Sequence, residues 1–316
     1  MAGTVADVGE FGLIERIREQ VPDSAGVGVG IGDDAAVIDW SGPVVAGVDT
    51  MVEGRHFKPE WVSGEDIGHR AAGAAMADVA AMGARPRALL AAVTLPPTTS
   101  LEWVADLVTG LTAEADEVGA ALVGGDVTRG DAVVVSITAL GSGGPAVRRG
   151  GAEPGDVVAL AGRQGWAAAG LTVLSRGFRS PRALVQAYQR PHPPYDSGPA
   201  AAQAGATAMI DVSDGLLADL QHLARESGVV ADLESELIPV ADQLSETSSA
   251  FNVDPLTWVL AGGDDHSLLA TFPAGSPLPS MFTMIGRITA PGANGPGVAV
   301  DGRLWSGQGG GHDHFR

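Results

Sequence analysis

The stretch MIDVSDGLLADLQHLARESG occupies residues 209–228. Its apolar start predicts a β-strand, and the SDG that follows predicts a turn because Asp and Gly favour turn conformations. Leu216, Leu217, Leu220 and Leu223 then recur at the spacing of one helix face. A strand that passes through an acidic turn into an amphipathic helix is the repeating unit of an α/β protein.

Strands and helices alternate through the rest of the chain as well. Glu10–Val21 predicts an opening helix whose apolar stripe, including Phe11, faces the core, and Thr99 with Glu102 forms a capping-box pattern for a later helix. Apolar runs and helical periodicity predict further strands at 44–50, 88–96, 121–130, 131–141 and 157–161, and further helices at 66–82, 165–175 and 181–188. The expected fold class is α/β (α+β), with mixed sheets flanked by helices.

The chain has 316 residues, which is enough for two domains that each bury a core. GSGGPAVRRGGAEPGD at residues 141–156 has the composition of a linker. We therefore predict an N-terminal domain at 1–145 and a C-terminal domain at 146–316.

Acidic residues outnumber basic ones by 38 to 19, and the formal net charge is -19. This charge makes nucleic acid and anionic membranes unexpected partners and cations favoured ones. The absence of cysteine excludes disulfides, thiolate metal sites and thiol nucleophiles, and it fits the cytoplasm. No signal-peptide pattern and no apolar stretch of about 20 residues occurs, so we expect neither secretion nor a membrane span.

Lys58 is the only lysine, and its context HFKPE matches neither a P-loop nor the strand lysine of protein kinases. The glycine-rich stretch GVGVGIGDD at residues 26–34 does not match the dinucleotide-binding fingerprint GxGxxG. If the protein binds ATP, groups other than lysine must neutralise its phosphates.

Aspartate lies beside Gly, Ser or Thr at five predicted strand ends, and Asp78 adds a carboxylate from a helix. The five turns are GDD at 32–34, VDT at 48–50, GGDVTRG at 124–130, DVSDG at 211–215 and GGDD at 262–265. Any one Asp-Gly turn is ordinary loop chemistry. Together they predict Mg²⁺ ions that bridge carboxylates to nucleotide phosphates, as phosphoryl transfer requires.

An acceptor that is itself a phosphate is anionic near neutral pH and needs no general base. We therefore assign no catalytic acid or base, and we expect charge neutralisation and alignment of the reactants to supply the catalysis.

Six motifs in this order resemble the thiamine-monophosphate kinase family over nearly the whole chain. They are IGDDAAV (31–37), GVDTMVEGRHF (47–57), MADVAAMGARP (76–86), GGDVTRG (124–130), IDVSDGL (210–216) and GGDDHSLL (262–269). The resemblance implies the two-domain architecture of aminoimidazole ribonucleotide synthetase and selenophosphate synthetase, a homodimer formed through the N-terminal domain, and ATP bound with several Mg²⁺ ions. It also implies thiamine monophosphate as the acceptor. Relatives in selenium and hydrogenase chemistry generally use a cysteine or selenocysteine, which this chain lacks.

The resemblance also implies roles for individual residues. The metal ligands would be Asp34, Asp49, Asp78, Asp126, Asp211 and Asp214, with Gly47 and Val48 beside them. Residues in contact with ATP would be Gly125, Asp126, Arg149 and Ser213, and residues in contact with the acceptor would be His56, Asp264 and either Trp305 or Phe315.

Two segments depart from the family pattern. GGDDHSL stands where the family has GGEDYEL, and GGGHDHF at 309–315 stands where it has GYDHF. Two other functions stay open. One is ATP-driven activation of an amide or formyl oxygen by an enzyme of the same superfamily, and the other is a non-catalytic protein that binds Mg²⁺ or nucleotide, in which the GGDD departure has removed acceptor recognition.

Overall fold

The computed structural model describes residues 3–306, which form two compact units. The first unit contains residues up to 79 and 85–143, and the second contains 80–84 and everything from 144 onward. Across the described residues, no helix combines the length and the apolar character needed to cross a membrane.

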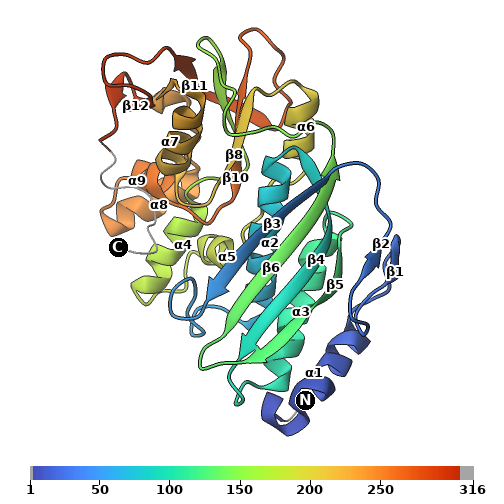
Figure 1. The fold of residues 1–316 in the computed structure, drawn as a ribbon. Helices are drawn as coiled ribbons and strands as arrows, with labels where there is room; N and C mark the ends of the chain where they lie inside the picture. The colour runs from blue at the N-terminus through green and yellow to red at the C-terminus, as the bar shows by residue number, and fades with distance from the viewer. Residues whose placement is uncertain (1–2, 307–316) are drawn as a thin grey trace. The chain divides into compact units, whose positions relative to one another are not determined.

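The first unit is a four-stranded sheet in the order β3-β6-β4-β5 with helices on one face (Figure 1). Its elements are α1 (Val5–Gln20), β1 (Val27–Val29), β2 (Val37–Ile38), β3 (Val44–Val52), α2 (Gly64–Ala81), β4 (Ala84–Leu95), α3 (Leu101–Asp116), β5 (Ala121–Arg129) and β6 (Val134–Gly143). β3 and β6 are antiparallel, whereas β4 and β5 are parallel. The sheet is therefore mixed, as predicted.

The helices α2 and α3 cover one face of this sheet and pack closely on each other. A Cβ atom on Gly68 would lie 2.3 Å from the Leu107 carbonyl oxygen, and one on Gly110 would lie 2.0 Å from the Glu65 carbonyl oxygen. On the other face, Val27 and Ile38 of the β1–β2 hairpin pack against a small apolar cluster that includes Ala88. The glycine-rich stretch that precedes Asp33 therefore belongs to a hairpin.

The second unit is built on a seven-stranded mixed sheet in the order β13-β12-β9-β11-β7-β10-β8. Its elements are β7 (Val157–Ala161), α4 (Trp166–Ser175), α5 (Arg182–Gln189), α6 (Ser197–Gln203), β8 (Ala208–Val212), α7 (Leu216–Ser227), β9 (Val230–Leu233), the short 3₁₀ helix η1 (Ser235–Leu237), α8 (Asp242–Phe251), α9 (Pro255–Ala261), β10 (Ser267–Phe272), β11 (Phe282–Thr289), β12 (Gly297–Val300) and β13 (Arg303–Leu304). Alternate residues of β7 face two apolar clusters, Val158 and Leu160 on one side and Ala159 and Ala161 on the other. Helices thus cover both faces of this sheet.

Two local predictions were wrong. Phe11 is 83% exposed, whereas Leu13 is the buried residue of α1, and Gly9 at φ 68° interrupts the start of this helix. The cap of α3 is Ser100, whose hydroxyl accepts the Trp103 amide, one residue after the predicted Thr99.

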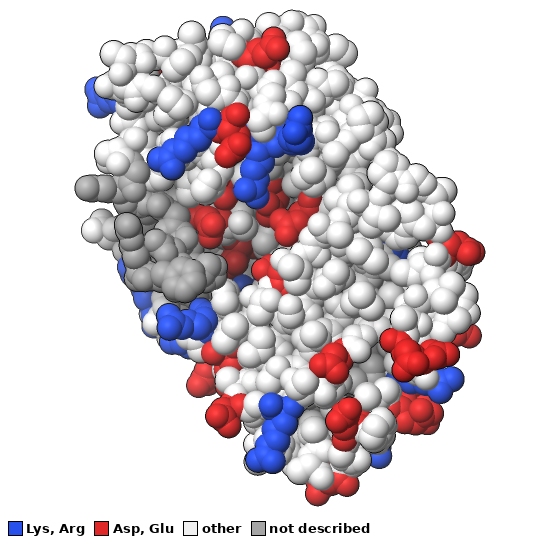
Figure 2. Space-filling view, viewed as in Figure 1, with Lys and Arg blue, Asp and Glu red and all other residues white. Residues whose placement is uncertain are grey.

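Much of the negative charge lies on exposed surface. Glu10, Glu15 and Glu19 of α1 are all exposed. Figure 2 shows Asp and Glu side chains gathered over the part of the first unit where Figure 1 places α1. These carboxylates face solvent, which is the ordinary position of surface charge.

Candidate active site

Three turns of the second unit meet at one edge of its sheet. β10 runs antiparallel to both β7 and β8, with Leu268 opposite Ala161 and Ser267 opposite Val212. The start of β10 therefore lies beside the C-terminal ends of β7 and β8. This topology brings together the turns at 162–166, 211–215 and 262–266.

Backbone contacts join the two acidic turns directly. The Asp264 amide donates to the Ser213 carbonyl oxygen at 2.9 Å, and the His266 amide donates to the Val212 carbonyl oxygen at 3.1 Å. A Cβ atom on Gly263 would lie only 2.0 Å from the Ser213 carbonyl oxygen. Glycine is therefore required where GGDD crosses DVSDG.

Asp211 is buried at the end of β8, and a histidine faces its carboxylate. His266 Nδ1 lies 3.2 Å from Asp211 Oδ2, and both side chains are less than a tenth exposed. His266 occupies the position at which the family pattern GGEDYEL has tyrosine. The imidazole restricts the orientation of a carboxylate that we predicted to bind metal.

Asp219, a residue of α7, holds the backbone at Asp214 in place through hydrogen bonds. Asp219 Oδ2 accepts the amides of Asp214 at 2.9 Å and Gly215 at 3.0 Å. Burial raises the pKa of the Asp219 carboxyl to about 7, and the nearby charges of Asp211 and Asp214 add to the increase. Asp219 thus acts as an internal cap that fixes the DVSDG turn.

The turn that carries Asp264 has an unusual backbone. Asp264 and His266 adopt φ values of 66° and 50°, a region that costs roughly 1–3 kcal/mol for residues other than glycine. Between them, Asp265 is buried, and its Oδ1 accepts the Ala167 amide at 2.9 Å. Burial raises the pKa of the Asp265 carboxyl to about 7, although amide donors from Ala167 and Gly165 oppose the increase.

This increased pKa predicts a pH dependence of stability. Between the unfolded value of 3.8 and about 7, the folded protein binds the proton more tightly than the unfolded chain does. Stability contributed by protonated Asp265 is therefore lost as pH rises through this window. Asp265→Asn stays neutral, so its free energy of unfolding should fall less than that of the wild type between pH 5 and 7. Urea titrations at several pH values test this, and parallel curves for both proteins would contradict it.

In the first unit, Asp49 and Asp78 lie on the helix-covered side of the sheet. Asp49 pairs with the buried Ile137, and a Cβ atom on Gly47, two residues earlier, would lie 3.7 Å from Asp78 Oδ2. Val48 points to the opposite face and is 63% exposed. Only the backbone of Val48 is therefore suited to assist a metal beside Asp49.

Asp126 lies on the other face of the same sheet. It pairs with Ala92, which shares its face with Leu90 and the apolar cluster under the β1–β2 hairpin. The strand bulges just before it, and a Cβ atom on Gly125 would lie 1.9 Å from the Ala91 carbonyl oxygen. Asp34 follows β1 of that hairpin, and both Asp34 and Asp126 are exposed. The carboxylates of this unit thus form two groups on opposite faces.

His56 is anchored in the turn after β3. Its Nδ1 accepts the Val52 amide at 2.9 Å, and its own amide donates to the Val52 carbonyl oxygen. A neutral ring in this position carries its proton on Nε2. Nε2 is therefore the nitrogen that would donate to an anionic acceptor.

The predicted nucleotide contacts of the second unit lie at different ends of β8. Ser213 belongs to the turn after β8, whereas Arg149 is exposed on a segment beside the start of the strand. The Met209 amide donates to the Arg148 carbonyl oxygen, and a Cβ atom on Gly151 would meet the Thr207 carbonyl oxygen. The structure does not bring Arg149 and Ser213 into contact.

The two aromatic candidates for the acceptor ring are Trp305 and Phe315. Trp305 is partly buried against the large apolar cluster of the second unit, and its amide donates to the Val298 carbonyl oxygen at 2.8 Å. Phe315 lies outside the described residues.

The oxygen donors of the predicted site suit Mg²⁺ that also binds substrate phosphates. Within 3–306, no three His, Asp or Glu side chains are arranged so that they alone could hold a metal ion. Magnesium usually keeps several waters and takes only one or two carboxylates together with substrate phosphates. Asp211 and Asp214, which lie on one turn, could supply the one or two carboxylates of such a site. The residues of the predicted site therefore fit Mg²⁺.

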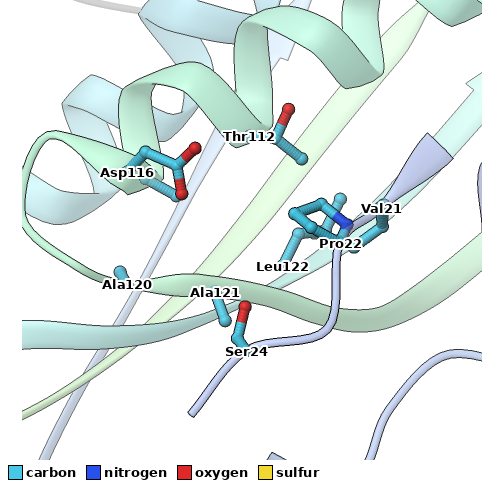
Figure 3. A pocket seen from close by; sticks show the side chains of 9 residues that line it. Val21, Pro22, Ser24, Thr112, Asp116, Ala120, Ala121 and Leu122 are labelled. Atoms are coloured by element: carbon cyan, nitrogen blue, oxygen red, sulfur yellow. The ribbon is translucent and has the colours of Figure 1, made fainter.

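A shallow pocket in the first unit has no role in this site. It is lined by Val21, Pro22, Ser24, Thr112, Ala115, Asp116, Ala120, Ala121 and Leu122 (Figure 3). Asp116 is its only ionisable residue, and the pocket contains none of the predicted site residues.

Asp219, Asp265 and Gln164 were not among the predicted site residues. Gln164 Nε2 donates to the carbonyl oxygens of Gly262 and Val259, and its Oε1 accepts the Ser267 hydroxyl at 2.7 Å. The position of Asp219 in the first turn of a helix that has no side-chain cap was the one available signal in the sequence.

Comparisons with known proteins agree with this arrangement. Residues 32–142 match the family model for the N-terminal domain of AIR synthase related proteins, and residues 153–269 match that for the C-terminal domain. A thiamine-monophosphate kinase of Mycobacterium tuberculosis is 40% identical over 97% of this chain and 92% of its own length.

Two solved structures are similar over nearly the whole chain. Thiamine-monophosphate kinase from Stenotrophomonas maltophilia K279a has a TM-score of 0.82 and 35% identity, covering 94% of this chain and 98% of that one. AaThiL complexed with AMPPCP and TMP has a TM-score of 0.80 and 28% identity, covering 99% of this chain and 100% of that one. The chain belongs to the thiamine-monophosphate kinase family, within the AIR synthase related proteins.

Proposed function

We propose that this protein phosphorylates thiamine monophosphate to thiamine diphosphate with ATP, by direct in-line transfer of the γ-phosphoryl group assisted by Mg²⁺. The observation that carries the proposal is similarity to thiamine-monophosphate kinases over 97% of the chain. A relative complexed with AMPPCP and TMP supports the pairing of a nucleotide with a phosphorylated acceptor.

In this proposal, aspartate carboxylates hold the metal ions. The ligands are Asp34, Asp49, Asp78, Asp126, Asp211 and Asp214, with the backbone at Gly47 and Val48. When bound, Mg²⁺ neutralises phosphate charge and aligns the attacking and leaving oxygens. Asp219 and His266 keep Asp214 and Asp211 in place and contribute no ligand themselves.

The substrates are assigned to the remaining residues. Gly125, Asp126, Arg149 and Ser213 contact ATP, and Arg149 supplies the guanidinium that replaces the missing phosphate-binding lysine. His56 and Asp264 contact the acceptor, whose ring stacks on Trp305 or Phe315. No general base is needed, because the attacking phosphate oxygen already carries negative charge.

The test is an incubation of the purified protein with ATP, Mg²⁺ and thiamine monophosphate, followed by fluorescence detection of oxidised thiamine diphosphate. We expect the diphosphate only with the monophosphate and only with metal, and none from thiamine. Binding of Mg²⁺ and ATP without this product would contradict the proposed function and favour a non-catalytic nucleotide-binding protein.

We also propose that the protein is a homodimer that pairs through the open face of the first sheet. Val44 and Val48 are 55% and 63% exposed on the face of β3 that α2 and α3 do not cover. Exposed apolar strand residues of this kind favour association.

Val44→Glu places a charge on this open face. It should convert a dimer into a monomer in analytical ultracentrifugation, whereas Ser41→Glu, an exposed position before the strand, should not. A wild-type monomer at micromolar concentration would contradict the proposal.

A cytoplasmic location is likewise proposed, from the absence of cysteine in the sequence. Neither nucleic acid nor membrane is an expected partner at this net charge.

A further inference from the structure

We propose that Asp265 is a positioning residue for the acceptor site, because its buried carboxylate ties the turn that presents Asp264 to the first turn of α4. The inference deepens the proposed function and rests on it, since Asp264 is assigned there to the acceptor. Asp265 itself contacts neither substrate nor metal.

The tie is a hydrogen bond to the start of a helix. Asp265 Oδ1 accepts the Ala167 amide at 2.9 Å, and the nearby Gly165 amide also opposes the increase in the pKa of this carboxyl. Gly165 is the N-cap of α4 and has no side chain with which to cap it. A carboxylate from another segment therefore satisfies a helix-terminal amide that would otherwise lack an acceptor.

The turn needs an anchor at its centre. Gln164 and Ser267 hold its two ends, through the Gly262 carbonyl oxygen and the start of β10. Within it, Asp264 and His266 both have positive φ. Such a conformation persists only where the surroundings impose it, and Asp265, only 5% exposed, is the side chain that joins these two residues to the helix.

The helix end to which Asp265 is hydrogen-bonded also carries an aromatic ring. Trp166 is the first residue of α4 and directly precedes Ala167, whose amide donates to Asp265. The Arg163 guanidinium stacks over the Trp166 ring at 4.8 Å. Asp265 thus sets the spacing between Asp264 and this helix terminus, and a reactant-binding residue must be held in a defined geometry.

A second buried carboxylate of the same unit provides the control. Asp156 is also 5% exposed, and its Oδ2 accepts the Glu153 amide at 3.0 Å and the Thr207 hydroxyl at 2.7 Å. It precedes β7, at the opposite end of that strand from the turn at 262–266. Loss of Asp156 removes comparable buried contacts without altering the position of Asp264.

The experiment compares Asp265→Ala, Asp265→Asn and Asp156→Ala with the wild type, using the full chain. We expect Asp265→Ala to raise the KM for thiamine monophosphate at least tenfold, with the KM for ATP changed less than threefold. Asp265→Asn retains Oδ1 as an acceptor, so its acceptor KM should stay within threefold of wild type. Asp156→Ala should lower the melting temperature without changing the acceptor KM.

An unchanged acceptor KM in Asp265→Ala, an equal increase in Asp156→Ala, or failure of the asparagine variant to restore the KM would each overturn the inference. If Asp265→Ala does not fold, Asp265→Ser replaces it, because serine is too short to reach the Ala167 amide.

Hydrogen exchange separates this inference from the proposed function. The amides of Ala167 and of 264–266 should exchange at least tenfold faster in Asp265→Ala than in Asp156→Ala. If the wild type makes no thiamine diphosphate, the proposed function is contradicted, but the role of Asp265 in holding the turn is not. If exchange at these amides is unchanged in Asp265→Ala, that role is overturned, whether or not the enzyme is active.

Discussion

Asp126→Asn lowers turnover with ATP and thiamine monophosphate by about a hundredfold or more, while the free energy of unfolding stays within roughly 0.5 kcal/mol of wild type. Asp126 is exposed on β5, and asparagine has nearly the same shape, so the fold does not depend on its charge. Binding of the proposed Mg²⁺ does depend on this charge, because an amide oxygen is a much weaker ligand for Mg²⁺ than a carboxylate is.

The matched control for this variant is Asp116→Asn. Asp116 is also exposed in the first unit, at the end of α3, and it lines the pocket of Figure 3 that lies outside the site. Turnover of the Asp116→Asn variant should equal that of the wild type. The measurement is kcat at saturating ATP over a range of Mg²⁺ concentrations, together with a thermal melt. An Asp126→Asn enzyme that keeps more than about a tenth of wild-type turnover would remove Asp126 from the metal site.

Gly263→Ala destabilises the second unit by about 3 kcal/mol or more, because the added methyl group has no space. Its Cβ would lie 2.0 Å from the Ser213 carbonyl oxygen and 3.2 Å from the Asp214 carbonyl carbon. Backbone atoms cannot move aside as a flexible side chain can. The turns that carry Asp214 and Asp264 must therefore separate, so activity should fall together with stability.

Gly292→Ala is the control for this steric argument, since no atom lies within 4 Å of the Cβ it would add. Urea denaturation of both variants gives the comparison, with the Gly292 variant within about 0.5 kcal/mol of wild type. If Gly263→Ala were as stable as wild type, the close crossing of the GGDD and DVSDG turns would be wrong.

Hydrophobic periodicity predicted most of the regular structure. The strand at 157–161 and the helix at 66–82 were predicted to within two residues, because each has a clear apolar pattern and a terminating Gly. The prediction that Phe11 faces the core was wrong for a physical reason. Periodicity identifies an apolar stripe but does not say which of its residues a neighbouring element covers. Gly9 at φ 68° further changes the start of that helix.

The acidic motifs located the turns, but they did not reveal what supports them. Asp219 accepts amides of the turn at 214–215, and Asp265 accepts an amide of α4, a contact that depends on how β10 pairs with β7 and β8. Pairing between distant strands is not encoded in a local motif. For the same reason, the sequence did not show that Asp49 and Asp126 lie on opposite faces of one sheet.

His266 illustrates how a departure from the family pattern can be interpreted only with the fold. The sequence showed that histidine replaces tyrosine and that serine replaces glutamate in GGDDHSL, which weakened the assignment of the acceptor contacts. In the structure, His266 Nδ1 lies 3.2 Å from Asp211 Oδ2, and the Ser267 hydroxyl donates to Gln164. Both replacements are accommodated within the network that holds the turn.

The most direct test of direct phosphoryl transfer follows the label from [γ-³²P]ATP in a single turnover, with enzyme in excess over ATP and with Mg²⁺ and thiamine monophosphate present. We predict that the label lost from ATP appears in thiamine diphosphate at the same rate, with none on the protein and none as inorganic phosphate. Label that first accumulates on the protein, or that is released as phosphate while thiamine monophosphate remains unchanged, would contradict direct transfer.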